Sequence, residues 1–196
     1  PVLEEVAGDA NTGAGNVEVA GGTLIYRPGK GPVRTWQVLA LDRLGRTEPL
    51  IADAGTYYTP AFSPNGDRLA LAVDYGDRGR EIAVYDVQRA SLQRLTFTKE
   101  VNLFPVWSPD GRYLAFESSS PTGYGLGLIR ADGGGALFRT LEHPCLMVPG
   151  SFSRDGQTLA YNDSQTETGF DIWTVTVGWS DPERPIPGNV GGDPDR

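Results

Sequence analysis

The sequence predicts an all-β fold built from repeated four-stranded antiparallel units, and three observations support this prediction. One phrase recurs at residues 62–70, 107–115 and 152–160, so its copies start at a constant spacing of 45 residues. The chain has 26 Gly and 15 Pro but keeps 7 Phe, 8 Tyr and 4 Trp, a composition typical of many short strands joined by turns. Apolar residues alternate along the chain, as at Ile82 and Val84, and no helical period is sustained over ten residues.

Each copy of the phrase predicts a hairpin followed by two further strands. An aromatic residue ends the first strand, Asn-Gly or Asp-Gly supplies the positive φ angles of a tight turn, and Leu-Ala begins the second strand. Third strands are expected at residues 37–42, 81–86, 126–130 and 171–176, and short fourth strands at 47–50, 92–96, 137–141 and, less clearly, 184–186. One spacing before the first phrase, residues 17–25 keep the turn and the apolar pair after it. A four-stranded unit that repeats in this way is the signature of a β-propeller blade.

The repeat divides the whole chain into blades. We expect residues 1–196 to form a single β-propeller, or a fragment of one, with blades at 16–53, 57–97, 102–142 and 147–187. Residues 1–15 are interpreted as the outer strand of a preceding blade or a linker, and residues 188–196 as a tail. The aromatic residues Phe62, Trp107, Phe152 and Trp173 are expected in the core between blades, where large flat side chains fill a wedge.

The repeated phrases resemble a known motif. Phe-Ser-Pro-Asn-Gly, Trp-Ser-Pro-Asp-Gly and Phe-Ser-Arg-Asp-Gly, each followed two residues later by Leu-Ala, resemble the WD-repeat-like motif of TolB-type bacterial propellers. The runs at 1–3, 12–14, 22–29 and 41–46 are similar to propellers attached to bacterial serine/threonine kinases. That resemblance implies a sensor or scaffold placed after a kinase and a membrane-spanning segment, in an extracytoplasmic or periplasmic location. Such propellers usually close with six or more blades, whereas four are counted here, so a larger or dimeric ring is expected.

Charge and composition exclude several classes of function. The chain has 17 Lys+Arg and 25 Asp+Glu, a formal charge of −8, which disfavours a nucleic-acid partner. No apolar run is long enough to cross a bilayer. The one cysteine, Cys145, cannot form a disulfide within the chain.

The residues that could carry chemistry are few. His143 is the one histidine, no nucleophile-elbow sequence is present, and a pair of His143 with Cys145 would need an external orienting group. One His and one Cys also fall short of the ligands that zinc requires. Asp74, Asp77, Asp163 and Asp171 are of the type that binds calcium, but solvated charge is the favoured interpretation. We therefore expect no catalytic residue, no metal site and no cofactor.

The remaining candidate site is a surface. The segments that enter the first strands stand 44 or 45 residues apart, and propeller geometry brings them together at one mouth of the central channel. The expected ligand-binding residues there are Tyr57, Tyr58, Asn102, Phe104 and Met147. Sealing of the contacts between blades is an equally weighted reading of the same residues. The favoured function is a non-catalytic recognition or scaffold module with a protein or peptide partner. A second copy of the chain, which would close the ring as a homodimer, is a further expected partner. The alternative is the substrate-gating propeller of a prolyl-oligopeptidase-like serine peptidase whose catalytic domain lies elsewhere.

Overall fold

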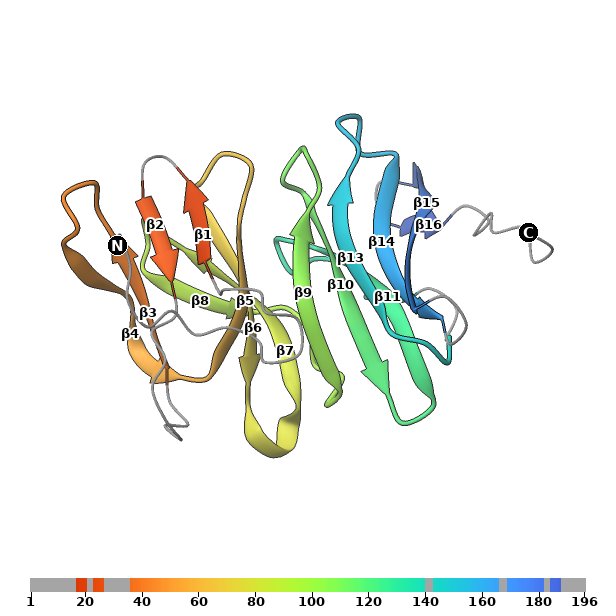
Figure 1. Ribbon diagram of the computed structural model, residues 1–196, viewed down its shortest axis with the longest axis horizontal. Helices are drawn as coiled ribbons and strands as arrows, with labels where there is room; N and C mark the ends of the chain where they lie inside the picture. Colours follow the sequence, from red (N-terminus) through yellow and green to blue (C-terminus); the bar gives the residue numbers. More distant parts are fainter. Residues whose placement is uncertain are drawn as a thin grey trace.

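The computed structural model describes residues 17–20, 23–26, 36–139, 143–165, 169–181 and 184–187, and strands dominate them (Figure 1). One 3-10 turn, Gly76–Arg78, is the only helical element in these residues. None of the described helices is long and apolar enough to cross a membrane. The predicted all-β fold is confirmed, while residues 1–16 and 188–196, the expected outer strand and tail, lie outside the described residues.

The strands fall into four consecutive groups of four, each pairing antiparallel in chain order. The first group is β1 (Val17–Ala20), β2 (Thr23–Tyr26), β3 (Trp36–Leu41) and β4 (Thr47–Gly55). The second is β5 (Tyr57–Phe62), β6 (Arg68–Asp74), β7 (Arg80–Asp86) and β8 (Ser91–Arg94). The third is β9 (Val101–Trp107), β10 (Tyr113–Ser120), β11 (Gly123–Arg130) and β12 (Phe138–Arg139). The fourth is β13 (Met147–Phe152), β14 (Thr158–Gln165), β15 (Gly169–Asp181) and β16 (Arg184–Pro187).

The groups follow one another along the longest axis of the molecule (Figure 1). A single parallel pair, Arg80 with Val101, joins the second and third groups into one eight-stranded sheet. The first strands β9 and β13 lie side by side and point the same way (Figure 1). Over the described residues the groups do not close into a ring.

The turn after each first strand has the same geometry in three groups. Ser63 N–H donates to Arg68 O at 2.9 Å, and Gly66 N–H donates to Ser63 O at 2.8 Å, which leaves a four-residue loop. The Ser63 hydroxyl accepts from Arg68 N–H at 3.0 Å. Gly66, Gly111 and Gly156 have φ angles of 76°, 68° and 73°, a region that favours glycine. The three repeated phrases therefore form tight hairpin turns, as predicted. The expected positive φ is found only at the glycine of each phrase, because Asn65, Asp110 and Asp155 have no positive φ.

Each of these first strands also carries a β-bulge at the same level. The register shifts by one residue between Tyr58 and Ala61 in β5, and opposite β10 residues Ala115 and Glu117 in β9. Two non-glycine residues with positive φ sit at these bulges, Thr59 at 45° and Phe104 at 53°. Proline cannot adopt a positive φ, so at Pro149 the extra residue moves to the following Gly150. The bulges aim the beginnings of the first strands away from the regular pleat.

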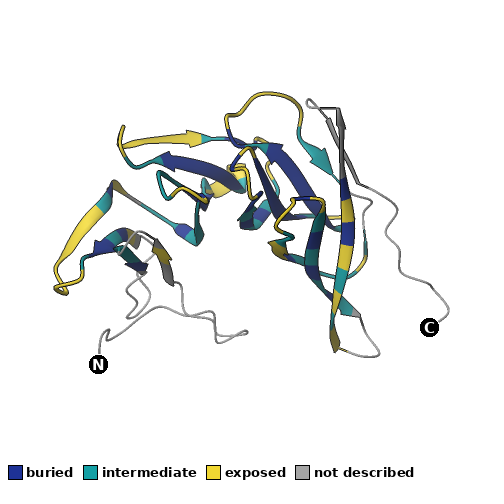
Figure 2. Ribbon diagram, turned by 90° about the horizontal axis from the view of Figure 1, so that it is seen from above, coloured by how far each residue is buried: buried dark blue, intermediate teal, exposed yellow. Residues whose placement is uncertain are grey.

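The apolar core lies between successive groups. One cluster joins the first and second groups through Ile25, Val38 and Leu71. A second cluster joins the second and third groups through Ile82, Leu114 and Phe116, and a third joins the third and fourth groups through Leu126, Leu159 and Val175. Of the expected core aromatics, Trp107 is buried, whereas Phe62, Phe152 and Trp173 are partly buried against these clusters. Figure 2 shows the buried residues gathered in the middle of the molecule.

Candidate functional site

Three of the expected ligand-binding residues occupy the same place in successive first strands and are buried. Tyr57 and Met147 are each 5% exposed, and Asn102 is 0% exposed. Side chains enclosed in this way offer no surface to a ligand, so these three act as packing and hydrogen-bonding residues in this structure. Tyr58 and Phe104 are half-buried. A ligand-binding role stays a prediction, and the structure leaves surface for it at these two positions.

The three buried positions define one row that crosses the second, third and fourth groups. The strand registers place Tyr57 opposite Val73, Asn102 opposite Ser118, and Met147 opposite Asp163. We call the passage from the second to the third group, residues 95–102 with Glu81, Ser118 and Arg139, the first junction. The second junction is the passage from the third to the fourth group, residues 143–147 with Asp163. The two junctions sit at equivalent places but carry different chemistry.

A buried carboxylate organises the first junction. Glu81 is 0% exposed, and its Oε1 accepts from Arg94 Nη2 at 3.0 Å and from Lys99 N–H at 2.8 Å. Its Oε2 accepts from the Thr96 hydroxyl and from Asn102 Nδ2, the latter at 3.1 Å. Both carboxylate oxygens are thus bonded to donors, as a buried charge requires.

The first junction continues into the third group through Asn102. Its Oδ1 accepts from the Ser118 hydroxyl at 2.7 Å, and that hydroxyl accepts from Arg139 Nη2 at 2.6 Å. Arg139 Nη2 also pairs with Glu100 Oε2 at 2.6 Å. An unbroken polar chain therefore runs from Arg94 to Glu100 and fixes one group on the next. The sequence reasoning missed Glu81, although a glutamate inside the otherwise apolar alternation of β7 was the available signal.

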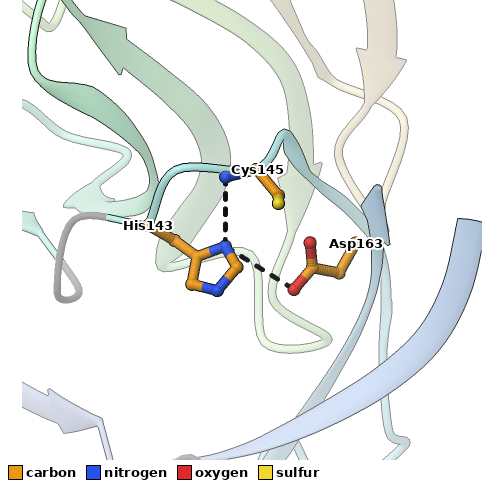
Figure 3. A group of neighbouring side chains, drawn as sticks. All are labelled: His143, Cys145 and Asp163. Carbon is orange, nitrogen blue, oxygen red and sulfur yellow. Dashed lines mark hydrogen bonds and ion pairs between the residues drawn. The ribbon is translucent and has the colours of Figure 1, made fainter. Parts of the chain in front are cut away.

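The second junction brings together His143, Cys145 and Asp163 (Figure 3). One potential ligand atom from each residue lies within 4.8 Å of the other two. The His143 backbone pairs with Tyr124 in both directions, at 2.8 and 2.7 Å, which anchors the segment on β11. Asp163 comes from β14, so only the folding of the fourth group adds it to the neighbouring His143 and Cys145. From the sequence, His143 and Cys145 were considered as a pair and Asp163 apart from them, because Asp163 stands far from the other two along the chain.

The carboxylate of Asp163 is not satisfied by its neighbours. Asp163 is 4% exposed, and its Oδ1 is buried without a hydrogen-bond partner. Its Oδ2 lies 3.8 Å from His143 Nδ1. That same Nδ1 accepts the Cys145 N–H at 3.2 Å, so it presents a lone pair rather than a proton. An acceptor on a buried carboxylate and an acceptor on a partly exposed imidazole therefore face each other.

This arrangement lacks the geometry of a Cys-His-Asp triad. In a triad, the two ring nitrogens of the imidazole serve different partners, one the nucleophile and the other the orienting carboxylate. Here one nitrogen, Nδ1, accepts the backbone N–H of Cys145 and is also the atom nearest the Asp163 carboxylate, and the other ring nitrogen lies away from both residues (Figure 3). Asp163 is thus an acidic group close to the His143–Cys145 pair, but it does not lie on the ring nitrogen opposite the nucleophile, where a triad places it.

Another buried carboxylate, that of Glu117, lies near the beginnings of the first strands. Glu117 is 3% exposed, and burial raises its pKa to about 7, an effect that the nearby Arg80 partly offsets. The Arg80 guanidinium stacks over the Tyr58 ring at 4.8 Å. Half-buried Tyr58 therefore adjoins the Arg80 guanidinium, which in turn lowers the raised pKa of Glu117.

The other acidic candidates from the sequence include Asp74, at the end of β6, and Asp171, on β15. Asp74 accepts from Gly76 N–H at 2.8 Å and pairs with Arg80 at 3.4 Å, which makes it a loop-forming residue. Asp163 and Asp171 stand opposite each other across β14 and β15. At the far end of the strands, the turns of the third and fourth groups border a groove of about 490 Å³ that includes Arg112 and Arg154. The Asp110 carboxylate there accepts from the Ser108 hydroxyl at 2.6 Å and so belongs to the turn itself.

Comparison with known proteins identifies the fold. No family model matches the chain, and no curated protein matches it. Among solved structures, a TolB described as putative from Agrobacterium tumefaciens has a TM-score of 0.64 at 18% identity, covering 85% of this chain and 61% of that one. TolB from Acinetobacter baumannii has a TM-score of 0.64 at 19% identity, covering 79% of this chain and 38% of that one. Dipeptidyl peptidase 4 from Porphyromonas gingivalis has a TM-score of 0.61 at 16% identity, covering 87% of this chain and 32% of that one.

These similarities concern the fold. The chain spans less than two thirds of the length of each of these three structures. Two of them are TolB proteins, the type whose turn motif the repeated phrases resemble. The chain therefore has the TolB-like β-propeller fold.

Proposed function

We propose that this chain is a non-catalytic recognition module made of four propeller blades that belong to a larger ring. The observation that carries the proposal is the open face of the fourth group. Ile82, Leu126 and Ile172 occupy one row, opposite Ala72, Glu117 and Asn162. The first two are 0% and 1% exposed because the next group covers them, whereas Ile172 is 79% exposed.

The open face is apolar as well as exposed. Phe170, next to Ile172 on the same side of β15, is 66% exposed. Residues on the opposite side of β15, such as Val175 and Val177, are buried against the third group. Exposed apolar surface of this kind marks an interaction site. A further blade or a second copy of the chain would cover it in the way that the third group covers Ile82.

The mouth at the beginnings of the first strands is the proposed recognition surface. Tyr58 and Phe104 remain half-buried there, and the β-bulges re-aim the strands that carry them. Aromatic side chains backed by a guanidinium, as Tyr58 is by Arg80, suit a peptide segment that brings an apolar group and a carboxylate. A sensor or scaffold role in a signalling protein agrees with such a surface.

A gating propeller of a serine peptidase is the second candidate. Dipeptidyl peptidase 4 and a prolyl endopeptidase, matched with TM-scores of 0.61 and 0.59, favour it. Among the described residues, the one Cys-His-Asp group lacks triad geometry, so in this reading catalysis would reside on another domain. Identification of the coding sequence on either side of this chain separates the two: a kinase with a membrane helix supports the sensor, and a hydrolase domain supports the gate.

Assembly provides the direct test on the purified chain. Closure by two copies predicts a light-scattering mass of about twice 21.1 kDa. Ile172→Asp, which places a charge on the open face, should give a monomer. Leu44→Asp, at a residue that is 78% exposed in the hairpin between β3 and β4, is the control and should remain dimeric. A wild-type monomer at high concentration would contradict closure by a second copy.

Binding and turnover test the function itself. Peptides selected by display on the purified chain should lose affinity at least tenfold with Tyr58→Ala, and should keep it with Leu44→Ala. Peptidase, esterase and kinase assays should show no turnover above background. Turnover that disappears with His143→Ala would contradict the non-catalytic proposal.

A further inference from the structure

The second junction has the composition of a metal site. His143, Cys145 and Asp163 contribute an imidazole nitrogen, a sulfur and a carboxylate oxygen that lie within 4.8 Å of one another. Imidazole, thiolate and carboxylate are the three ligand types that proteins use for zinc. In a tetrahedral zinc site such atoms stand about 3.5 Å apart, given bond lengths of 2.0–2.3 Å. The 3.8 Å between Nδ1 and Oδ2 is close to that separation.

An independent observation points to a cation. The Asp163 carboxylate is buried, and its Oδ1 has no hydrogen-bond partner. At the equivalent place of the third group, the Ser118 hydroxyl is fully engaged with Asn102 and Arg139. Proteins rarely bury a carboxylate oxygen without a donor or a cation. The structure assigns His143, Cys145 and Asp163 as ligands of a divalent transition metal, with Zn²⁺ as the ion that their chemistry fits best.

Charge balance supports a doubly charged ion. Binding requires the Cys145 thiol to release its proton to solvent, so that a Zn–S bond replaces the S–H bond. The thiolate and the Asp163 carboxylate then carry two negative charges, which Zn²⁺ neutralises. His143 contributes a neutral imidazole nitrogen, and coordination through Nδ1 replaces the hydrogen bond that this atom accepts from the Cys145 N–H. Three protein ligands leave the fourth position to water or to a donor group from a bound partner.

The site would tie the third group to the fourth. His143 is paired to Tyr124 of β11, Cys145 leads into β13, and Asp163 lies on β14. A bound ion therefore bridges the linking segment and the second strand of the fourth group. The ion would thus connect the third group to the fourth, as the hydrogen-bond chain through Glu81 connects the second group to the third.

Cobalt and zinc titrations test the assignment directly. Co²⁺ added to the reduced, chelator-treated protein should give the absorption of a cobalt–thiolate bond at one ion per chain, and Zn²⁺ should displace it. Cys145→Ser should abolish the thiolate band, and Asp163→Ser should weaken Co²⁺ binding at least about 100-fold, beyond the usual loss for groups outside the ligand shell. Asp171→Asn, a change to the acidic residue opposite Asp163, is the matched control and should bind as the unmodified chain does.

A second measurement needs no variant. Cys145 is the one cysteine and is partly exposed, so its reaction with a thiol reagent reports on this position alone. Zn²⁺ at micromolar concentration should slow that reaction at least tenfold. Absence of a thiolate band, binding that survives Cys145→Ser, or an unchanged rate of thiol modification would each overturn the assignment.

Discussion

Both junctions connect one group of strands to the next, but the buried carboxylate is fully hydrogen-bonded at the first junction and only partly satisfied at the second. At the first, Glu81 and Asn102 exchange hydrogen bonds with each other and with neighbours on both sides. At the second, Met147 replaces the amide, and the carboxylate of Asp163 has an oxygen that no donor reaches. The two buried side-chain atoms without a partner in the described part of the chain, Asp163 Oδ1 and Trp173 Nε1, both belong to the fourth group.

This difference shows that equivalent positions of a repeat can carry different chemistry while the fold stays the same. Equivalent residues keep the strand register, so the backbone of the fourth group follows that of the third. A saturated polar chain contributes rigidity, because every member is bonded. An unsaturated position costs stability and is therefore available to a ligand that supplies the missing partner.

The largest effect is expected from breaking the first junction at its centre. Glu81→Ala leaves Arg94 and the Asn102 amide without their shared acceptor. Removal of one partner from a buried ion pair typically costs 3–5 kcal/mol. Urea unfolding measures the loss, with exposed Glu48→Ala as the control. A loss below about 1 kcal/mol would mean that the chain of hydrogen bonds does not stabilise the junction.

The buried carboxylate of Glu117 should make stability depend on pH. Its folded pKa of about 7 lies above the usual 4.5, so the folded state binds the proton more tightly than the unfolded state does. The stabilisation is fully present below about pH 4.5 and is lost as the pH rises through about 7, by roughly 3 kcal/mol. Urea unfolding from pH 4 to 8 measures this contribution as the difference between the unmodified chain and Glu117→Gln. The two should diverge as the pH rises, and parallel pH profiles would contradict the raised pKa.

Exchange of equivalent residues sharpens the comparison. Asn102→Met gives the first junction the residue of the second, and leaves the Ser118 hydroxyl and the Glu81 carboxylate each short of a partner. The expected cost is about 2 kcal/mol, in the range for buried groups left unsatisfied. Met147→Leu conserves apolar volume and should change the free energy of unfolding by less than 1.5 kcal/mol. Equal losses in the two variants would show that the two positions differ only in packing.

The smallest effect should have the opposite sign. Asp163→Ser places the residue of the third group in the fourth and removes a buried carboxylate whose Oδ1 has no hydrogen-bond partner. In chelator-treated protein we expect a gain of about 1 kcal/mol in the free energy of unfolding. Thermal unfolding with and without chelator measures it. A loss of stability in the chelator-treated protein would show that Asp163 already has a stabilising partner.

Most of the fold could be predicted from local sequence. The Ser-Pro-Asp-Gly phrase determines the turn through glycine at positive φ and through the serine hydroxyl, and both act within a few residues. The fourth strand of the third group was less predictable. It was expected at residues 137–141, whereas β12 comprises Phe138–Arg139, and an edge strand pairs on one side only, so few contacts determine its length.

The candidate sites were less accessible to sequence reasoning. Asn102 was predicted to lie at the surface because two of its partners, Glu81 and Ser118, come from two other strands. The same holds for Asp163, which joins His143 only through the pairing of β13 with β14. A site assembled from separate strands leaves no spacing pattern in the sequence.

Local hydrogen exchange tests the central claim that a bound cation completes the second junction, whereas the first junction is complete through its own hydrogen bonds. The amides of His143 and Tyr124 report on the second junction, and those of Arg80 and Ile82 report on the first. In chelator-treated protein, the second junction should exchange faster than the first. Zn²⁺ should slow exchange at His143 and Tyr124 at least tenfold and leave Arg80 and Ile82 unchanged. Exchange that is equally fast at both junctions, or that Zn²⁺ leaves unaltered at His143, would contradict the account.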